Sequence, residues 1–426
     1  MKKFITILLI LAMAVSLAAC GNEETLGELP VTEAPATEET QAPDFAIEAP
    51  LPSGESVELT WSSWAMADPE VLALYQTIAD AYNESNSYNI TVTLVPPTEG
   101  EDFQMELLFD AASGIGPDVA QISAQWLPQL LELGVVRCLN SNVSQAVMED
   151  HIPGIREAVV VNGELMALPW YARPSALLVN RELCARAQVD PAAIASWEDL
   201  MAAAEKIAGL EADVYGLGIP ASGTEPGEGY HILPVLWARG GEFQTEGQIR
   251  LESEAALRAC ADLQKLFSEK ISPEAATVQE LRSLFAAGKL GFYWDTEEEM
   301  PEAQALPFPG CLDTQVLAVL DSCGQEKMAA AAHFMDYLSG EPVISQLREA
   351  GHSVMSGRRS VLAELFAGEN SYAQAMEQTR SLPVLHLRFQ EVDGMLSEML
   401  RELAQGGDVA GILTKWDAAI QEVYDD

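Results

Sequence analysis

The chain has 426 residues, enough for two or three domains of about 150 residues each. Its 23 basic and 65 acidic residues give a formal net charge of −42, which repels phosphate backbones and anionic membranes and excludes nucleic acid as a partner. Apolar residues make up 48% of the chain, which excludes a largely disordered protein. A mean hydropathy of +0.06 with one long apolar run excludes a polytopic membrane protein.

The first twenty residues carry the features of an export signal. Two lysines precede Phe4–Ala19, a stretch of 16 uncharged residues that is short for a spanning helix and suits a signal peptide. It ends in the sequence LAAC, which resembles a bacterial lipobox with its cysteine at Cys20. We therefore predict a lipoprotein signal peptide over 1–20, cleaved before a diacylated Cys20. Its lipid anchor alone would hold the mature protein at the extracellular face of the cell membrane. An uncleaved anchor helix is the alternative.

Residues 21–56 differ in composition from the rest of the chain. They hold nine acidic residues, five prolines and no lysine or arginine, a composition typical of a disordered acidic linker. The predicted role of this segment is reach, because it would hold a folded part over 57–426 away from the membrane.

Five cysteines follow the lipobox, at Cys138, Cys184, Cys260, Cys311 and Cys323. An odd number cannot pair fully, and no CxxC spacing points to a metal or redox site. Mostly buried free thiols are the expected state, and a Cys311–Cys323 bridge is the open alternative.

Hydrophobic periodicity predicts alternating strands and helices through the folded part. Strands are expected at Val57–Trp61, Ile90–Val95, Asp118–Ile122, Ala176–Val179, Leu290–Trp294 and Val316–Leu320. Helices are expected at 71–82, 107–112, 126–133, 197–208, 254–268 and 327–338, and over most of the last fifty residues. This alternation predicts an α/β fold with mainly parallel sheets flanked by helices.

A search for catalytic motifs finds none of the familiar ones. The patterns GxSxG, HExxH, GxxxxGK[ST] and a GxGxxG after a strand are absent. The five histidines have no ligand-like spacing, and the acidic run Glu297–Glu299 lacks the oxygen-ligand spacing of a calcium loop. We therefore expect no metal, no cofactor and no enzyme activity. A carboxylate pair for glycoside hydrolysis stays open, since 65 acidic residues offer many pairs.

Four of the eight tryptophans fall just beyond predicted strands, at Trp64, Trp126, Trp170 and Trp294. In open α/β sheets, ligands bind outside the carboxyl ends of strands. An aromatic face at such a position can stack on the apolar face of a sugar ring or on a cation. Core packing is the alternative for each of them.

An ordered series of short segments is similar to a known family. In chain order the segments are Leu59–Trp64 (LTWSSW), Ala112–Val119 (ASGIGPDV), Asn162–Pro169 (NGELMALP), Leu177–Leu183 (LLVNREL), Ser196–Leu200 (SWEDL) and Phe285–Phe292 (FAAGKLGF). In this order they resemble the extracellular solute-binding proteins of carbohydrate ABC importers, the group that includes maltose-binding protein. Each segment is weak alone, and the series spans nearly all of 57–426.

This resemblance implies a two-lobed periplasmic-binding-protein-like fold of class II, in which α/β lobes joined by crossing strands close on a ligand. The crossings would lie near Arg173–Asn180 and Leu306–Leu312. Lobe one would hold 57–175 and 310–352, and lobe two 176–309 and 353–426. The implied ligand-binding residues are Trp64, Gln125, Trp126, Trp170, Arg173, Tyr230, Trp294 and Asp295.

The aromatic members of this set would be platforms, and the implied role of Gln125, Arg173 and Asp295 is to bond ligand hydroxyls. A structural ion pair is the alternative for Arg173. The resemblance thus implies a lipid-anchored, monomeric substrate-binding subunit that captures a sugar or oligosaccharide and delivers it to ABC permease subunits. A polyamine or other small cation as ligand, a sensory receptor and a surface hydrolase remain as alternatives.

Overall fold

The computed structural model describes residues 56–100, 102–245, 248–368, 370–382 and 388–425. The expected signal peptide with Cys20, and all but the last residue of the expected linker 21–56, lie outside these residues. Across the described ranges, no helix is both long enough and apolar enough to cross a membrane.

One mixed sheet of nine strands runs through the fold, with the main strand order β2-β1-β3-β11-β6-β10-β7. Strand β12 pairs with β6, and β13 pairs with β11. The strands are β1 (Val57–Ser63), β2 (Ile90–Leu94), β3 (Val119–Ser123), β6 (Leu168–Val179), β7 (Tyr215–Gly218), β10 (Leu290–Asp295), β11 (Gln304–Val319), β12 (Met355–Ser356) and β13 (Thr379–Ser381). Two short hairpins lie apart from it, β4–β5 (Val160–Val161, Glu164–Leu165) and β8–β9 (Gln244–Thr245, Gln248–Ile249).

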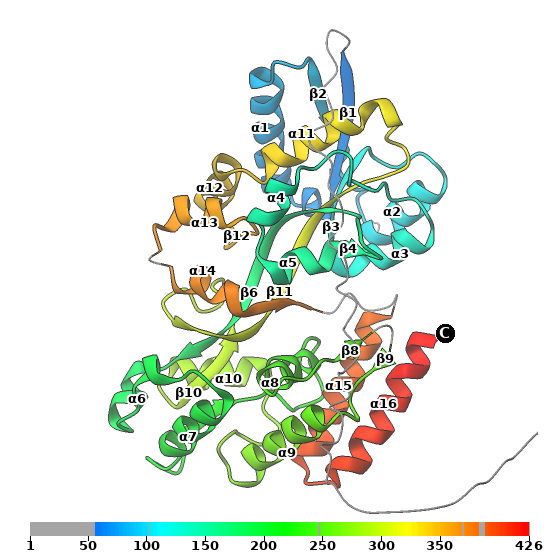
Figure 1. Ribbon diagram of the computed structural model, residues 1–426. Helices are drawn as coiled ribbons and strands as arrows, with labels where there is room; N and C mark the ends of the chain where they lie inside the picture. The colour runs from blue at the N-terminus through cyan, green and yellow to red at the C-terminus, as the bar shows by residue number, and fades with distance from the viewer. Residues whose placement is uncertain (1–55, 101, 246–247, 369, 383–387, 426) are drawn as a thin grey trace, which may run out of the picture. The chain divides into compact units, whose positions relative to one another are not determined.

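The strand pairing is less parallel than the sequence predicts. Strand β1 pairs in parallel with β2 and β3, and β10 pairs in parallel with β7. The long strands β6 and β11 instead run antiparallel to each other, and β11 is antiparallel to β3. The reason is that β6 and β11 pass between the same two hydrophobic clusters in opposite directions, so they cannot share one orientation (Figure 1).

The helices cover the sheet as the α/β prediction requires (Figure 1). They are α1 (Pro69–Ser85), α2 (Phe103–Ala112), α3 (Leu127–Glu132), α4 (Gln145–Asp150), α5 (Pro153–Arg156), α6 (Arg181–Arg186), α7 (Trp197–Ala208), α8 (Ile232–Ala238), α9 (Glu254–Ser268), α10 (Val278–Ala286), α11 (Met328–Leu338), α12 (Glu341–Glu349), α13 (Arg359–Phe366), α14 (Ser371–Ala375), α15 (Phe389–Ala404) and α16 (Val409–Asp425). The predicted bounds of α7 and α9 are confirmed at both ends. Local sequence explains both starts, because Ser196 forms a capping box with Asp199 and Ser253 caps α9.

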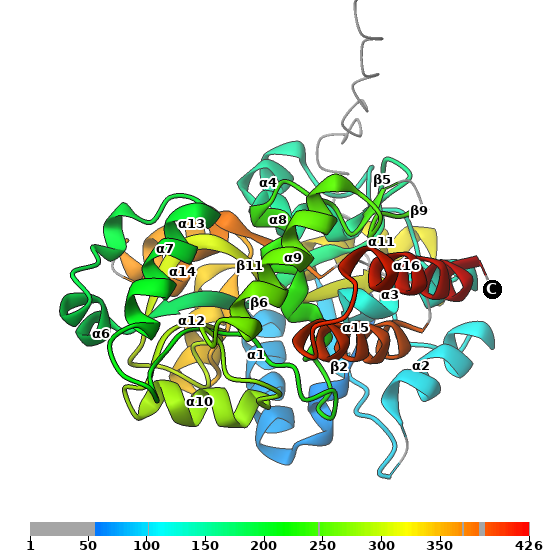
Figure 2. The ribbon, with the colours of Figure 1, turned by 90° about the horizontal axis from the view of Figure 1, so that it is seen from below.

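Two large hydrophobic clusters define the two lobes. The first gathers side chains from β1, β2, β3, α1 and α11, among them Trp61, Tyr82 and Phe334. The second gathers side chains from α7, α8, α9, α15 and α16, with α15 and α16 packed side by side (Figures 1 and 2). Strand β11 contributes Phe308 to the second cluster and Val316 to the first. The crossing strands are therefore part of both cores.

The structure differs from the sequence expectations in the extent of the crossing strands and in the lobe that holds two valines. The predicted strands 176–179 and 316–320 mark only the ends of β6 and β11, whose other halves contain prolines that argue against a strand. A register shift between Leu306 and Cys311 accommodates the prolines of β11. In addition, Val354 and Val361, expected in lobe two, pack in the first cluster.

All five described cysteines are free thiols, so Cys311 and Cys323 form no bridge. Four of them are buried, and Cys138 is half-buried. Burial raises the pKa of the Cys184 thiol to about 11, which keeps it protonated and inert at neutral pH. The expectation of mostly buried free thiols is confirmed.

Candidate functional site

Trp64 lies at the end of β1, in the 3₁₀ turn η1 (Trp64–Ala67). The Ser63 hydroxyl caps this turn by accepting a hydrogen bond from the backbone N–H of Ala65 at 3.0 Å. The Trp64 ring is half-buried, and its Nε1–H donates to Oε1 of Gln315 on β11 at 3.0 Å. One face of the first lobe thus presents a tryptophan that is fixed at its polar edge and partly open to solvent.

A buried polar network lies directly behind this tryptophan. Oε1 of Gln121 accepts from the hydroxyls of Ser63 at 2.6 Å and Tyr75 at 3.1 Å. The Nε2 group of Gln121 donates to the hydroxyl of Tyr171 at 2.9 Å and to Oε1 of Gln315 at 3.4 Å. Each of these side chains is at least 96% buried, so the network is sealed from water and rigid. It fixes the floor of the site.

Arg173 stands where β6 crosses between the lobes, between two carboxylates. Its guanidinium lies 3.8 Å from Asp313 on β11 and 3.7 Å from Glu298 in the turn after β10. Desolvation raises the pKa of the Asp313 carboxyl although Arg173 opposes the shift, and yet 44% of the Asp313 side chain is exposed. The Asp313 carboxylate is therefore accessible from solvent at the crossing. Arg173 forms the ion pairs considered as its alternative role, at distances that leave hydrogen-bonding capacity for a ligand.

Gln125 and Trp126 follow β3 in a second 3₁₀ turn, η2 (Ala124–Trp126). Ser123, which caps this turn, pairs with Gln315 across the sheet. Both residues are half-buried, and the Trp126 ring lies 6.2 Å from that of Phe103 on α2. The sheet thus brings η1 and η2 to the same edge, beside Gln315. The predicted residues Trp64, Gln125, Trp126 and Arg173 gather there.

Trp170 and Trp294 do not join this group. Both lie within strands, in β6 and β10, and are 0% and 1% exposed. Trp170 donates to the carbonyl of Leu338 at 2.7 Å, and Trp294 donates to the carbonyl of Pro309 at 2.8 Å. The prediction that they are platforms beyond strand ends is wrong for this structure, because each strand continues past its tryptophan and turns the ring into a core.

Asp295 is also engaged within the protein. Its carboxylate is 4% exposed and accepts two hydrogen bonds from Arg282 of α10, at 2.8 and 3.0 Å. The backbone N–H of Thr296 also donates to its Oδ1, at 2.9 Å, so most of the roughly four lone-pair sites of this carboxylate are used within the protein. Asp295 therefore holds α10 against β10, and the structure gives it no open face toward a ligand.

Tyr230 lines a separate cavity of about 470 Å³ in the second lobe. The opposite wall is the start of α15, and the Tyr230 hydroxyl donates to the carbonyl of Phe389 at 3.0 Å. Asp393 accepts from the backbone N–H groups of Gly227 at 2.6 Å and Gly229 at 3.1 Å, which anchors the loop before Tyr230. Gly229 is required, because a Cβ there would lie 2.3 Å from the carbonyl oxygen of Asp393. This volume is in the range of small-molecule sites.

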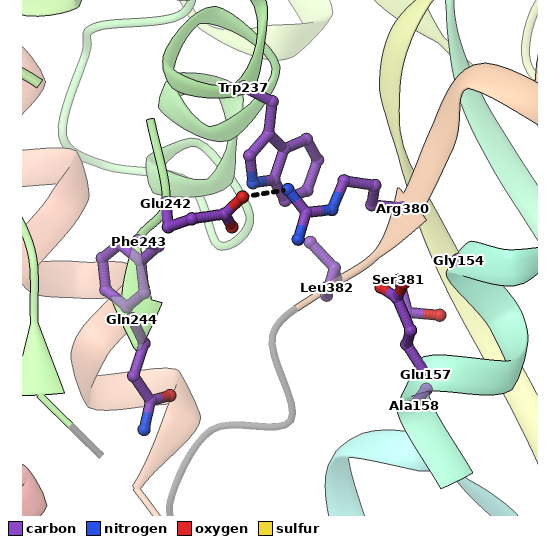
Figure 3. A pocket seen from close by; sticks show the side chains of 10 residues that line it. All are labelled: Gly154, Glu157, Ala158, Trp237, Glu242, Phe243, Gln244, Arg380, Ser381 and Leu382. Atoms are coloured by element: carbon purple, nitrogen blue, oxygen red, sulfur yellow. Dashed lines mark hydrogen bonds and ion pairs between the residues drawn. The ribbon is translucent and has the colours of Figure 1, made fainter. Parts of the chain in front are cut away.

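A second cavity, of about 210 Å³, lies among α5, β13 and the segment after α8 (Figure 3). It contains an aromatic ring, but Arg380 covers the face of Trp237, 5.1 Å from the ring centroid, and pairs with Glu242 at 2.9 Å. It contains none of the predicted site residues and is smaller than typical ligand pockets. We therefore do not assign it as the functional site.

The acidic run after β10 is saturated by arginines. Glu297 pairs with Arg348, Glu298 with Arg173 and Glu299 with Arg282, each arginine coming from a different element. Among the described residues, no group of three or more metal-ligating side chains could hold an ion. The considered calcium site is therefore replaced by an ion-paired turn.

Sequence reasoning missed Gln121, Asp313, Gln315 and Phe389 as site residues. The signal for two of them was present, because Asp313 and Gln315 interrupt an apolar strand with polar side chains at a spacing of two, which places them on one face. Gln121 gave no such signal, since only the folded sheet brings its four partners together.

Two lobes joined by crossing strands, with half-buried aromatics and polar side chains at the crossing, define a ligand-binding protein of the two-lobed class. The chain belongs to the bacterial extracellular solute-binding protein family, whose profile matches residues 68–343.

Solved structures show the same fold. The extracellular solute-binding protein from Staphylococcus aureus in complex with maltose is 18% identical with a TM-score of 0.73, over 87% of this chain and 99% of that one. The cyclic alpha-maltosyl-1,6-maltose binding protein from Arthrobacter globiformis is 18% identical with a TM-score of 0.72, over the same shares of the two chains. At this level of identity, the likeness is one of fold.

Relatives found by sequence match about half of the chain. A protein of Brucella abortus (strain 2308) named as a binding protein is 25% identical over 191 residues, or 44% of this chain and 46% of that protein. The maltotriose-binding protein of Pyrococcus abyssi (strain GE5 / Orsay) is 22% identical over 237 residues, or 53% of this chain and 47% of that protein. The chain thus spans about half the length of these relatives.

Proposed function

We propose that this chain is the substrate-binding subunit of an ABC importer and that it captures a sugar or oligosaccharide. The observation that carries the proposal is the group formed by Trp64, Arg173 and Asp313: a fixed, half-open indole beside one donor and one acceptor of hydrogen bonds. Sugars need that combination, because a pyranose ring has an apolar face for stacking and a rim of hydroxyls. Similarity to proteins named for maltose and maltotriose supports this ligand class.

The second lobe would supply the other wall through Tyr230 and Phe389. A ligand shifts an open–closed equilibrium only through its differential affinity for the two states, so both lobes must gain contacts on closure. We place the lobe boundaries near 175 and 309, and the return of the chain to the second lobe after Val361 rather than near 352. Closure about β6 and β11 would then bring the two walls onto one ligand.

A small cation is the competing ligand, because Asp313 and Glu298 are both acidic. Arg173 lies within 4 Å of both carboxylates and offsets part of their charge. A neutral, hydroxyl-rich ligand fits this balanced group better than a polyamine does. The same two carboxylates are the candidates for a hydrolase, and their common pairing with Arg173 favours binding without chemistry.

A thermal-shift screen over maltodextrins, other sugars, polyamines and amino acids tests the ligand class. A ligand at 100 times its dissociation constant stabilises the folded state by about 2.7 kcal/mol, which raises the melting temperature visibly. We expect a shift with a sugar and none with spermidine. A melting-temperature shift with spermidine alone would contradict the proposal. If the protein hydrolyses the sugar, the chain is a hydrolase rather than a binding subunit.

Delivery to permease subunits and a lipid anchor at Cys20 complete the proposed role. Mass spectrometry of membrane-extracted protein should find a diacylated N-terminal cysteine at position 20. An intact Met1 on the mature protein would contradict cleavage before Cys20. Deletion of 21–56 should leave the affinity for the sugar unchanged, since the nine acidic residues and five prolines of this segment favour a disordered linker over a pocket wall. Loss of uptake in a deletion strain would favour transport over sensing. We expect a monomer in solution.

A further inference from the structure

The indole of Trp64 is held by a residue that is distant in sequence and lies on a crossing strand. Gln315 is 251 positions away, 3% exposed, and accepts the indole N–H at 3.0 Å. In the sheet, Gln315 pairs with Ser123 on one side and with Tyr171 on the other. It therefore stands between the strand that leads to Gln125 and the strand that carries Arg173.

The direction of each hydrogen bond around Gln315 is fixed by its neighbours. The Trp64 indole N–H can only donate and the Asp313 carboxylate accepts, so Oε1 of Gln315 faces Trp64 and its Nε2 group faces Asp313. The Nε2 group of Gln121 donates to the same Oε1, which leaves Oε1 of Gln121 to accept from the hydroxyls of Ser63 and Tyr75. Oε1 of Gln315 consequently receives both the Gln121 amide and the Trp64 indole. Its Nε2 group is left to donate to Oδ1 of Asp313 at 3.3 Å. A flipped Gln315 amide would set donors against donors at two contacts.

One buried side chain thus binds both an aromatic platform and an acidic residue of the proposed sugar site. We infer that Gln315 is a positioning residue: it fixes the orientation of the Trp64 ring and of the Asp313 carboxylate, and it ties both to β11. The inference rests on the proposed function for its consequence in binding, and on the hydrogen bonds alone for its structural part.

The physical reason is preorganisation. Trp64 belongs to a 3₁₀ turn rather than to a strand, and its ring is half-buried, so packing alone restrains it less than a core residue. A ring that must be ordered when the ligand arrives reduces the affinity. Because β11 contributes Phe308 to the second hydrophobic cluster and Val316 to the first, movement between the lobes would reach the Trp64 ring through Gln315.

The structural part is tested on the full chain labelled with ¹⁵N-indole tryptophan. Loss of one indole signal in Trp64→Phe assigns the resonance. In Gln315→Met, which keeps the length of the side chain and removes its amide, the Trp64 signal should move upfield, and its N–H should exchange with water about tenfold faster. Gln304→Met, the same change at the other end of β11, is the matched control and should leave the signal unchanged. An unchanged Trp64 signal in Gln315→Met would overturn the inference.

The binding part is tested by a double-mutant cycle with the sugar found in the screen, or with maltose as the first probe. Gln315→Met and Trp64→Phe should each weaken binding about 3- to 10-fold. The double variant should lose less than the product of the two losses, because the part of Gln315 that acts through the indole is already gone in Trp64→Phe and only the part through Asp313 remains. Additive losses would contradict a role through the indole. If Gln315→Met does not fold, Trp64→Phe still removes the same hydrogen bond from the other side. Should no sugar bind the native chain, the proposed function fails while the indole spectra still decide the positioning role.

Discussion

Trp64 and Trp294 lie at corresponding places in the two lobes, each near the carboxyl end of a strand, yet their surroundings are opposite. Trp64 follows the last residue of β1, turns outward in a 3₁₀ turn and is half-buried. Trp294 precedes the last residue of β10 and is 1% exposed in the second hydrophobic cluster. A difference of two positions relative to the strand end separates a candidate platform from a core residue.

The polar neighbours show the same contrast. In the first lobe, Gln315 and Asp313 leave Trp64 and Arg173 accessible at the crossing. In the second lobe, Asp295 accepts two hydrogen bonds from Arg282 and is not available to a ligand. The half-buried aromatic residue there is Tyr230, in a loop that Asp393 anchors through the backbone N–H of Gly229. The second wall of the proposed site is therefore built from a loop and a helix start rather than from a strand end.

The largest expected effect concerns the core side of this comparison. Trp294→Ala removes a fully buried indole from the second cluster and should lower the free energy of unfolding by about 3–5 kcal/mol. Urea unfolding followed by far-UV circular dichroism measures this change. Trp170→Ala is the matched variant in the first cluster and should cost about as much. A loss below about 1 kcal/mol for Trp294→Ala would show that this ring is not a core residue and would make it a candidate ligand platform again.

A second prediction is that the stability of the first lobe falls in acid because of the buried His151. His151 is 0% exposed, with Nδ1 2.7 Å from the carbonyl of Val147, and burial lowers its pKa to about 4. The unfolded pKa is about 6.5, so the stability contributed by neutral His151 is fully present above pH 6.5 and lost as the pH falls through about 4. The full loss is about 3 kcal/mol.

Unfolding free energies of the native chain and of His151→Gln, measured between pH 7 and pH 4, isolate this contribution. The variant should show a shallower fall with decreasing pH, whatever its stability at pH 7. In the second lobe, burial also lowers the pKa of His231, although Asp295 opposes the shift. His231→Gln should therefore also show a shallower fall, and it measures the contribution of the second lobe. Equal slopes for native chain and His151→Gln would show that other groups carry the acid sensitivity.

A third prediction tests the role of Asp295. Asp295→Asn removes the charge that holds Arg282 and should lower the free energy of unfolding by about 2 kcal/mol, less than a fully buried pair because Arg282 is 23% exposed. Calorimetry with the identified sugar should show little change in affinity. A large loss of affinity at unchanged stability would instead make Asp295 a ligand residue, as the family resemblance implies.

The sequence predicted most elements because their signals are local. Apolar residues at helical spacing mark the helices, and runs rich in β-branched residues such as Ile90–Val95 mark strands. The long strands were predicted only at their ends, since Pro174 and Pro307 break the pattern that defines a strand. Of the residues that the family resemblance implies for the site, Trp64, Gln125, Trp126 and Arg173 lie near one another at the sheet edge beside Gln315, and their role in binding remains a proposal. The positions of Gln121 and Gln315 depend on strands paired across 194 residues of sequence, which no local pattern contains.

The smallest expected effect on stability concerns Trp64 itself. Trp64→Ala leaves the sealed network of Gln121 intact and removes a half-buried ring, so the free energy of unfolding should fall by about 1 kcal/mol or less. Its effect on the binding free energy should be larger, about 1–3 kcal/mol, because the exposed face of the ring is buried only when a ligand stacks on it. Isothermal calorimetry with the identified sugar, beside urea unfolding of the same samples, measures both. Trp294→Ala should show the reverse pattern, with a large loss of stability and, in the fraction that folds, near-native affinity. If Trp64→Ala unfolds the protein while the affinity survives, the two tryptophans are alike and the site lies elsewhere.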